Sequence, residues 1–236
     1  MKHTLAPFKN EPFTDFTDSA TRRGMIEALE HVTGELGRTY GLVIAGQRVS
    51  ASKSFSSTNP ARPAQVIGIH PEATPEIAEL AVEAARLAFP EWSKTPVADR
   101  VDVLLRAAAL IRERHLEFCA WLTVEVGKNW AEADADVGEC IDFLEFYARE
   151  ALRLAGSKTP IQFPGERNLL RYVPVGIGAV IPPWNFPFAI MAGMTTASIV
   201  CGNTVVLKPS PDAPTIAARF VALLEEAGLP DGVVNL

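Results

Sequence analysis

Apolar residues recur at helical spacing over most of the middle of the chain. The three stretches with this period are residues 75–89, 97–126 and 131–154. Prolines between 90 and 96 separate the first two stretches, and Gly127-Lys128-Asn129 separates the last two. Because an apolar stripe needs a partner to cover it, the pattern predicts three long helices packed on a shared core.

Shorter elements are expected before these helices. After an N-terminal arm, a helix is predicted from about residue 19, with Asp18 or Ser19 as its N-cap. Two short β-branched runs then surround Ala45-Gly46, a pattern typical of a hairpin, and residues 54–70 continue as strands and turns.

Beyond residue 155 the pattern changes to that of extended chain. Residues 156–172, with Pro164-Gly165 near the centre, favour a hairpin that projects from the body. The elements expected after it are a strand at 178–181, a helix at 187–200, a strand at 204–208, a helix at 214–227 and a strand from Val233. Continuous apolar strands in a βαβαβ order are typical of a parallel sheet covered on both faces, so the predicted fold class is α/β.

The last predicted helix has a stop signal, because Gly228 follows it and Pro230 lies two residues further on. The chain then ends inside the strand that starts at Val233, for which no covering element is expected. Such a strand would leave an unpaired edge and an apolar face. We therefore expect an incomplete sheet, and a chain that is the front part of a longer protein or is completed by another piece.

Composition narrows the class of protein. With 48% hydrophobic residues among 236, the chain can bury a large core. The formal charge of −6 comes from 28 acidic and 22 basic side chains that are interspersed, which argues against a nucleic-acid surface. No signal peptide or stretch of about 20 apolar residues is found, so we expect a soluble cytoplasmic protein without a membrane segment.

The cysteines and histidines offer little chemistry. All three cysteines lie in apolar or helical stretches without CxxC spacing, and no two histidines have metal-ligand spacing. The residues concerned are Cys119, Cys140, Cys201, His3, His31, His70 and His115. We expect buried thiols that are poor nucleophiles, and no metal site.

A more informative stretch is AVIPPWNFPF at residues 179–188, where Asn185 lies between Trp184 and Phe186. It follows a predicted parallel strand, and open α/β sheets bind ligands at that end of their strands. Two interpretations remain open from the residues. Asn185 is either a turn residue that bonds its own backbone before a helix, or a rigidly held amide directed at an oxyanion.

A second candidate is Glu139 on the third long helix. One side of that helix carries an apolar stripe of Val137, Ile141, Leu144 and Ala148. Glu139 lies on the opposite side, flanked by Phe143 and Phe146, which predicts a carboxylate among rings that either has a raised pKa or needs a cationic partner. The alternative is a glutamate at the helix edge that is solvated or paired within the protein. The neighbouring Glu132, Asp134 and Asp136 are expected to form a solvated acidic rim.

Linked motifs connect the chain to a known family. The sequence VIPPWNFPFAIMAG, followed by CGNTVVLKPS and AGLPDGVVN, resembles the aldehyde dehydrogenase superfamily. The segments EPFTDF, GKNWAEADADVGECIDFLEFYARE and MAGMTTASIVCGN are similar to its 1-pyrroline-5-carboxylate (glutamate semialdehyde) dehydrogenase branch. The resemblance implies that residues 173–236 are the first part of a Rossmann-like NAD-binding core. Residues 1–155 would be the N-terminal helical and strand part of the same cofactor-binding domain, and residues 156–172 an oligomerisation hairpin. The catalytic domain would be absent from this chain.

The resemblance also implies roles for particular residues. Asn185 would be the oxyanion donor, Glu139 would contact the bound amino acid semialdehyde, and Phe186 would line the aldehyde channel. Residues expected at the cofactor are Ile181, Pro182, Trp184, Lys208 and Ser210. The nucleophilic cysteine, the general base and the glycine turn of the cofactor site would lie beyond Leu236.

The implied activity is NAD-dependent oxidation of glutamate semialdehyde to glutamate in proline degradation, by a homo-oligomer. NADP stays open as the cofactor, because Pro211 occupies a position where many NAD-preferring relatives carry a glutamate. The alternatives are a different aldehyde dehydrogenase, such as one for succinate semialdehyde, or a non-catalytic cofactor-binding or assembly module.

Overall fold

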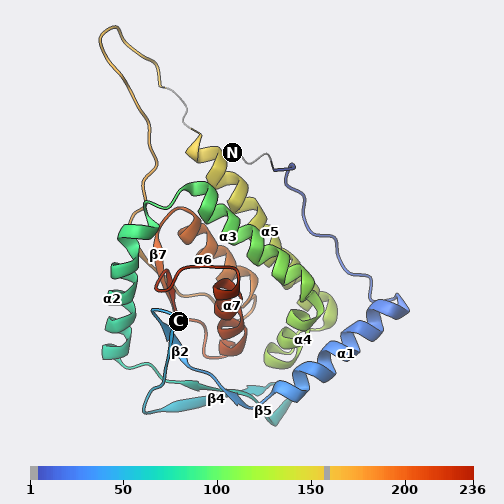
Figure 1. The fold of residues 1–236 in the computed structure, drawn as a ribbon. Helices are drawn as coiled ribbons and strands as arrows, with labels where there is room; N and C mark the ends of the chain where they lie inside the picture. Colours follow the sequence, from blue (N-terminus) through green and yellow to red (C-terminus); the bar gives the residue numbers. More distant parts are fainter. Residues whose placement is uncertain (1–4, 157–159) are drawn as a thin grey trace.

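A computed structural model describes residues 5–156 and 160–236 (Figure 1). The helices are α1 (Ser19–Glu35), α2 (Pro75–Trp92), α3 (Val97–Glu113), α4 (His115–Val126), α5 (Trp130–Ala155), α6 (Ala189–Val200) and α7 (Pro214–Glu226). The strands are β1 (Arg38–Thr39), β2 (Leu42–Ile44), β3 (Gln47–Val49), β4 (Ser54–Asn59), β5 (Arg62–Pro71), β6 (Ile177–Val180), β7 (Thr204–Leu207) and β8 (Val234–Asn235).

The predicted parallel sheet is present, and the α/β class is confirmed. Its strands lie in the order β6-β7-β8, all parallel, with Ile177 opposite Thr204 and Val205 opposite Val234. In β7 the successive residues Thr204 and Val205 are both fully buried, so both faces of the sheet are covered at its centre. Helices α2 and α6 pack against it.

The parallel sheet has three strands among the described residues, which agrees with the expected incomplete sheet, but its last strand is not left without a partner, because the separate N-terminal hairpin of β2 and β3 meets it at Leu236. Strands β2 and β3 are joined by Ala45 and Gly46, whose φ angles of 49° and 74° are those of a tight hairpin turn. Val43 and Leu236 exchange two backbone hydrogen bonds of 2.9 and 2.8 Å. Figure 1 accordingly shows the C-terminus beside β2. Residues about 190 positions apart therefore pair directly.

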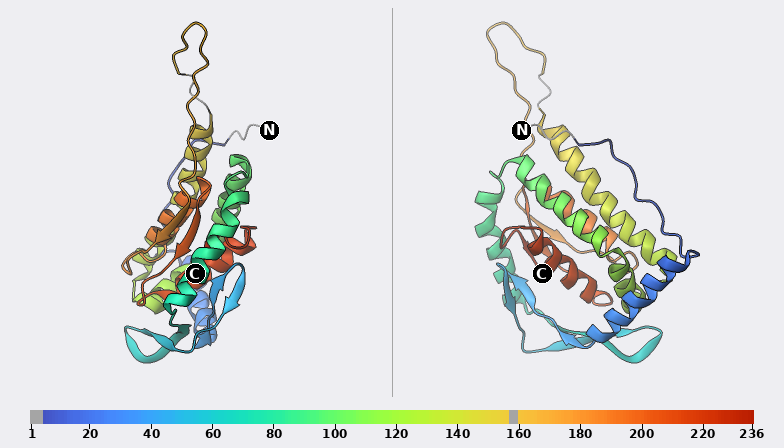
Figure 2. Two further views of the ribbon diagram at one scale, coloured as in Figure 1. Left: turned by 90° about the vertical axis from the view of Figure 1, so that its left-hand side faces the viewer. Right: turned by 45° about the vertical axis from the view of Figure 1, so that its right-hand side comes forward.

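A second sheet lies below the helices, as the views of Figure 2 show. Its order is β1-β5-β4, in which β1 is parallel and β4 antiparallel to β5.

Helix boundaries agree with the sequence except in two places. Pro90 lies inside α2 instead of ending it, because the final turn is anchored by Trp92, which is buried and donates its indole N–H to the carbonyl of Ile199. The predicted helix 97–126 is divided at Arg114, where φ is −107° and ψ is 24°. The helical spacing of apolar residues continues across this bend, so periodicity alone could not locate it.

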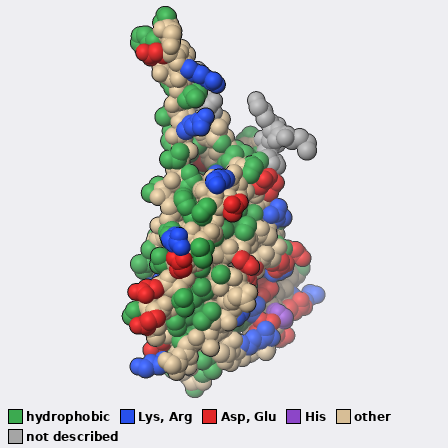
Figure 3. All heavy atoms as spheres, turned by 60° about the vertical axis from the view of Figure 1, so that its left-hand side comes forward, with side chains coloured by type: hydrophobic (Ala, Val, Ile, Leu, Met, Phe, Trp, Pro, Cys, Tyr) green, Lys and Arg blue, Asp and Glu red, His purple; other side chains and the backbone are tan. Residues whose placement is uncertain are grey.

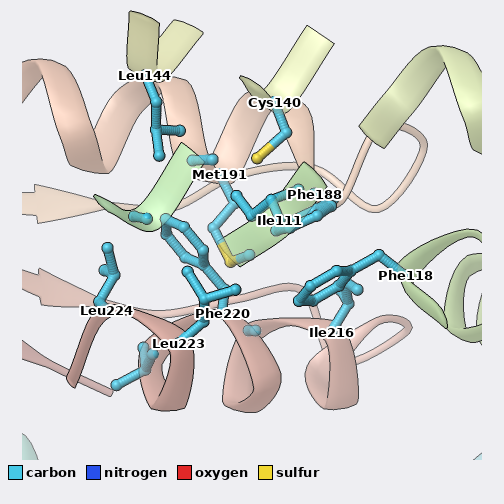
Figure 4. Packing of buried hydrophobic residues seen from close by; sticks show 14 of the residues in the cluster. Ile111, Phe118, Cys140, Leu144, Phe188, Met191, Ile216, Phe220, Leu223 and Leu224 are labelled. Carbon is cyan, nitrogen blue, oxygen red and sulfur yellow. The ribbon is translucent and has the colours of Figure 1, made fainter. Parts of the chain in front are cut away.

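The main hydrophobic core joins helices from both halves of the chain. Figure 4 shows Phe188 and Met191 of the α6 region facing Phe118 of α4, Cys140 of α5 and Phe220 of α7. Helices α5 and α6 approach closely because Gly193 has no side chain: a Cβ there would lie 2.9 Å from the ring of Phe143.

The segment 160–176 projects from the body, as Figure 1 shows, but forms no strand in the part of the chain described. Its tip is closed by side chains, since Gln162 accepts from the backbone N–H of Asn168 at 2.8 Å and donates to its carbonyl at 2.9 Å. The hydrophobic side chains exposed along it are Ile161, Phe163, Leu169, Leu170, Tyr172, Val173 and Val175.

Some apolar surface is also exposed on the body. Leu80 and Leu87 of α2 are 57% and 64% exposed, and Figure 3, which brings the left-hand side of Figure 1 forward, shows hydrophobic side chains spread over this face. Within residues 5–156 and 160–236, no helix is both long and apolar enough to cross a membrane.

Candidate active site

A rigid corner, residues 181–188, connects β6 to α6. At one end Val180 is 3% exposed and belongs to the parallel sheet. At the other end the buried ring of Phe188 stacks on Phe118, with centroids 4.7 Å apart, and meets Phe220 edge-on at 5.8 Å. Because both ends are fixed in packed structure, the corner between them has few conformations available.

Asn185 lies at the tip of this corner and is exposed. Its side chain lines a cavity of about 240 Å³ together with Val126, Gly127, Lys128, Glu132, Trp184 and Phe186. Among the described residues, no group hydrogen-bonds the Asn185 carboxamide. The interpretation as a turn residue bonding its own backbone is therefore not realised, and the amide N–H groups remain available to a ligand in the cavity.

A buried ion pair lies beneath the corner. The ammonium of Lys128 is 3.7 Å from the centre of the Phe186 ring and 3.1 Å from Asp136 Oδ2. The other oxygen of Asp136 accepts the backbone N–H of Ala189, the first residue of α6, at 2.7 Å. One carboxylate thus contacts both the start of α6 and the cation under the corner.

The prediction that three neighbouring carboxylates form a solvated rim is wrong for two of them. Asp134 and Asp136 are 3% and 0% exposed, whereas Glu132 is exposed as predicted. Burial raises the pKa of the Asp136 carboxyl, and the neighbouring Lys128 acts in the opposite direction. The sequence did contain an indication that Asp136 is buried. It lies three residues after Ala133 and four before Cys140, and these two apolar residues share its helix face.

Glu139 was expected among buried rings, but it is exposed. The rings of Phe143 and Phe146 beside it are only partly covered, Phe146 being 41% exposed. The predicted stripe of Val137, Ile141, Leu144 and Ala148 is fully buried. Helix α5 therefore packs on α3, α4 and α6 with that stripe, and presents Glu139 to the surface of this chain.

The residues predicted at the cofactor occupy two places. Lys208 and Ser210 lie on the wall of a second cavity of about 470 Å³, which is bordered by β5, the start of α2 and the end of β7. Lys208 is exposed, and its ammonium donates to the carbonyl of Pro209 at 3.1 Å. Ile181 and Trp184, 62% and 55% exposed, lie with the buried Pro182 at the end of β6.

A buried polar network lies next to this second cavity. Glu125 accepts the backbone N–H groups of Thr215 and Ile216 at 2.7 and 2.8 Å. It also accepts the hydroxyl of Ser57 at 3.2 Å. Helix α7 has no side-chain cap of its own, so Glu125 performs that role from α4. Burial raises the pKa of Glu125, and these hydrogen bonds oppose that rise.

His70 belongs to the same network and predicts a pH dependence of stability. Burial lowers its pKa from 6.5 to about 4, while its ring stacks on Tyr40 and meets the Thr215 hydroxyl at 3.0 Å. Between pH 6.5 and 4 the unfolded chain binds a proton that the folded protein does not. The free energy of unfolding should therefore fall by about 3 kcal/mol as the pH is lowered through this range.

Urea unfolding of the His70→Phe variant measures this contribution, because phenylalanine keeps the ring and does not titrate. The fall in the free energy of unfolding between pH 6.5 and 4 should be about 3 kcal/mol smaller in this variant than in the unaltered protein. The matched control is His31→Gln, at an exposed position on α1, which should leave the fall unchanged. An equally steep fall in His70→Phe would show that His70 is not its source.

One cluster has the composition of a metal site. The ligand atoms of His115, Cys119 and Asp134 lie within 4.8 Å of one another. No metal site was expected from the sequence, although His115 and Cys119 are four residues apart on α4. Their polar atoms have protein partners: His115 Nε2 is 2.6 Å from Asp134 Oδ1, and Thr14 N–H donates to Asp134 Oδ2 at 2.9 Å. The cluster fixes the N-terminal arm to α4 and α5.

The cysteines differ in exposure. Cys119 and Cys140 are fully buried, and burial raises the pKa of both thiols. Cys201 is exposed, contrary to the expectation that all three are buried. It follows α6 at the end opposite to the corner, about 18 Å along a helix of 12 residues.

Comparison with known proteins identifies the family. The model of the aldehyde dehydrogenase family matches residues 48–236, and the chain belongs to this family. Its curated relatives include 1-pyrroline-5-carboxylate dehydrogenase of Geobacillus thermodenitrificans, 52% identical over 98% of this chain and 45% of the relative. The chain thus spans about 45% of the length of the curated relatives it matches.

Solved structures agree. A 1-pyrroline-5-carboxylate dehydrogenase from Thermus with bound NAD superposes with a TM-score of 0.96 at 47% identity, covering 99% of this chain and 46% of that one. The enzyme from Mycobacterium tuberculosis bound with NAD gives 0.92 at 32% identity, covering 99% and 44%. The resemblance found in the sequence motifs, including the branch, is therefore confirmed.

Proposed function

We propose that the protein containing this chain oxidises glutamate semialdehyde, the open form of 1-pyrroline-5-carboxylate, to glutamate with NAD. The observation that carries the proposal is Asn185, an unpaired carboxamide held on a rigid corner at the wall of a cavity. Relatives about half identical to this chain are named for this substrate.

Asn185 is proposed to stabilise the negative charge that forms on the aldehyde oxygen when a thiolate attacks the carbonyl carbon. Its N–H groups need no rearrangement to meet that charge, because the corner is already fixed. The thiolate and the base that activates water are proposed to come from the part of the protein outside this chain. Cys119 and Cys140 are buried, and Cys201 lies at the far end of α6.

The cofactor is proposed to lie along the ends of β6 and β7. When bound, NAD supplies a nicotinamide ring that accepts hydride from the substrate. Lys208 and Ser210 would hold its adenosine ribose, and their cavity has room and polar groups for such a ligand. Ile181, Pro182 and Trp184 would border the nicotinamide half. Pro211 provides no carboxylate to repel a 2′-phosphate, so NADP is proposed as a second cofactor.

At the substrate end, Phe186 is proposed to line the aldehyde channel and Glu139 to pair with the substrate ammonium. A carboxylate suits this role, because a hydrogen bond between two charged groups is stronger than one between neutral groups. Succinate semialdehyde has no ammonium, and this chemical difference separates the two candidate substrates.

A comparison of the two semialdehydes tests this assignment in the protein that contains the chain. The kcat/KM for glutamate semialdehyde should exceed that for succinate semialdehyde. Glu139→Gln should lower that advantage about 10-fold or more, the value of a charge-assisted hydrogen bond, while turnover of succinate semialdehyde stays unchanged. A preference for succinate semialdehyde would favour the other dehydrogenase class, and no turnover of any aldehyde would favour a non-catalytic module.

The projecting segment is proposed to join subunits into a homo-oligomer. Its exposed apolar side chains, Ile161 at 83% and Phe163 at 63% among them, are unusual on a monomer surface. Replacing both by serine should shift the protein to a smaller species in sedimentation velocity. The matched control is Glu166→Gln at the tip of the same segment, which should leave assembly unchanged, whereas unchanged assembly in the double serine variant would contradict the proposal.

A further inference from the structure

The ion pair beneath the corner suggests a role beyond stability. Lys128 is 9% exposed and Asp136 is 0% exposed, so both charges have left water, which is costly unless they compensate each other. Among the described residues, Asp136 Oδ2 accepts no conventional hydrogen bond, and the ammonium 3.1 Å away is its compensation. Displacing either charge would therefore leave the other buried and uncompensated.

The two charges contact the chain at two points that follow Asn185. The Lys128 ammonium faces the ring of Phe186, the next residue in sequence, at 3.7 Å in a cation–π contact. Asp136 accepts the backbone N–H of Ala189 at 2.7 Å, where its negative charge also suits the start of α6. Lys128 itself lines the cavity that Asn185 lines.

We propose that Lys128 and Asp136 are positioning residues that fix the direction of the Asn185 carboxamide. This inference rests on the proposed function of Asn185. A purely structural pair would stabilise the fold without affecting the transition state. Removing a positioning pair would lower kcat, and only through the amide, because the amide acts on charge that develops during the reaction.

The test uses Lys128→Met/Asp136→Asn, which removes both charges together. Methionine retains an unbranched side chain under Phe186, and asparagine retains an oxygen that accepts from Ala189. Removing Lys128 alone would leave a buried carboxylate unpaired, and the loss of stability would obscure the result. Lys53→Met, at an exposed lysine, is the matched control.

In the protein that contains the chain, the double variant should lower kcat at least 10-fold with KM for NAD unchanged. In an Asn185→Ala background the same double change should cost less than 2-fold, because the amide through which it acts is gone. Lys128→Arg, which keeps the charge and can stack on the ring, should recover most of the activity. Equal losses with and without Asn185 would overturn the positioning role.

Amide hydrogen exchange gives a readout that does not depend on the proposed activity. Exchange at residues 185–189 should become at least 10-fold faster in the double variant, and should remain unchanged in Lys53→Met. Unchanged exchange in the double variant would contradict the inference even in an active enzyme. If the protein showed no aldehyde turnover and exchange were still faster in the double variant, the result would support the role of Lys128 and Asp136 in holding residues 185–189 and would reject the proposed function.

Discussion

Replacing Asn185 by alanine is expected to lower kcat by about 10²–10³-fold in the protein that contains this chain, with little change in KM. This is the usual cost of removing one donor from an oxyanion site. The substrate carbonyl carries little charge before attack, so a donor placed for the oxyanion contributes mainly to the transition state. Steady-state kinetics with glutamate semialdehyde and NAD measure both parameters.

Stability should be unaffected by this change, because Asn185 is exposed and makes no hydrogen bond to the described part of the chain. Circular dichroism melting checks this. Asn10→Ala is the matched control: it removes another exposed amide, one that donates to Asp142 at 2.7 Å, and should keep kcat within 2-fold. A kcat in Asn185→Ala close to that of the unaltered protein would remove Asn185 from the mechanism.

Replacing Glu125 by alanine is expected to lower the free energy of unfolding by about 3–5 kcal/mol. The change leaves the backbone N–H groups of Thr215 and Ile216 and the hydroxyl of Ser57 without their acceptor in a buried site. Each orphaned donor costs about 1–3 kcal/mol, and the start of α7 loses its cap. Urea unfolding followed by circular dichroism measures the loss.

Two variants separate this cost from the removal of any glutamate. Glu125→Gln keeps the shape and one acceptor oxygen, and should cost less than Glu125→Ala. Glu30→Ala, at an exposed position on α1, should change stability by less than about 0.5 kcal/mol. A loss in Glu125→Ala no larger than in Glu30→Ala would show that α7 does not depend on this cap.

The sequence predicted the elements of the parallel sheet well, for a physical reason. Strands β6 and β7 are short continuous apolar runs, and α6 and α7 end at glycine turns, so local preference and burial agree. The Ala45-Gly46 turn was equally accessible, because two residues with positive φ require that kind of sequence. These elements were identified within one or two residues.

Burial within α5 was the weakest part of the prediction. The spacing of apolar residues predicted Glu139 in the interior because two phenylalanines flank it, yet those rings are partly exposed and the fully buried carboxylate of this helix is Asp136. The faces of an amphipathic helix that become buried depend on the helices that pack against it, here α3, α4 and α6. That arrangement is a tertiary property, and residue spacing along one helix does not contain it.

In the candidate site too, local features could be read from the sequence and long-range contacts could not. Asn185 was proposed because a polar residue among prolines and rings at a strand end is conspicuous, and it lies at a cavity wall. Lys128 was treated only as part of a break between helices, because its partners Asp136 and Phe186 lie 8 and 58 positions away. Glu125 was not identified, since its partners on α7 are 90 positions distant. Contacts of this kind become visible only when the chain is folded.

The most direct test of the oxyanion assignment is a crystal structure of the whole protein with NAD and glutamate bound. Asn185 Nδ2 should lie about 2.7–3.1 Å from an oxygen of the product's γ-carboxylate, the position of the former aldehyde oxygen. A carboxamide turned into solvent, with that oxygen held by other donors more than about 4 Å away, would contradict the account.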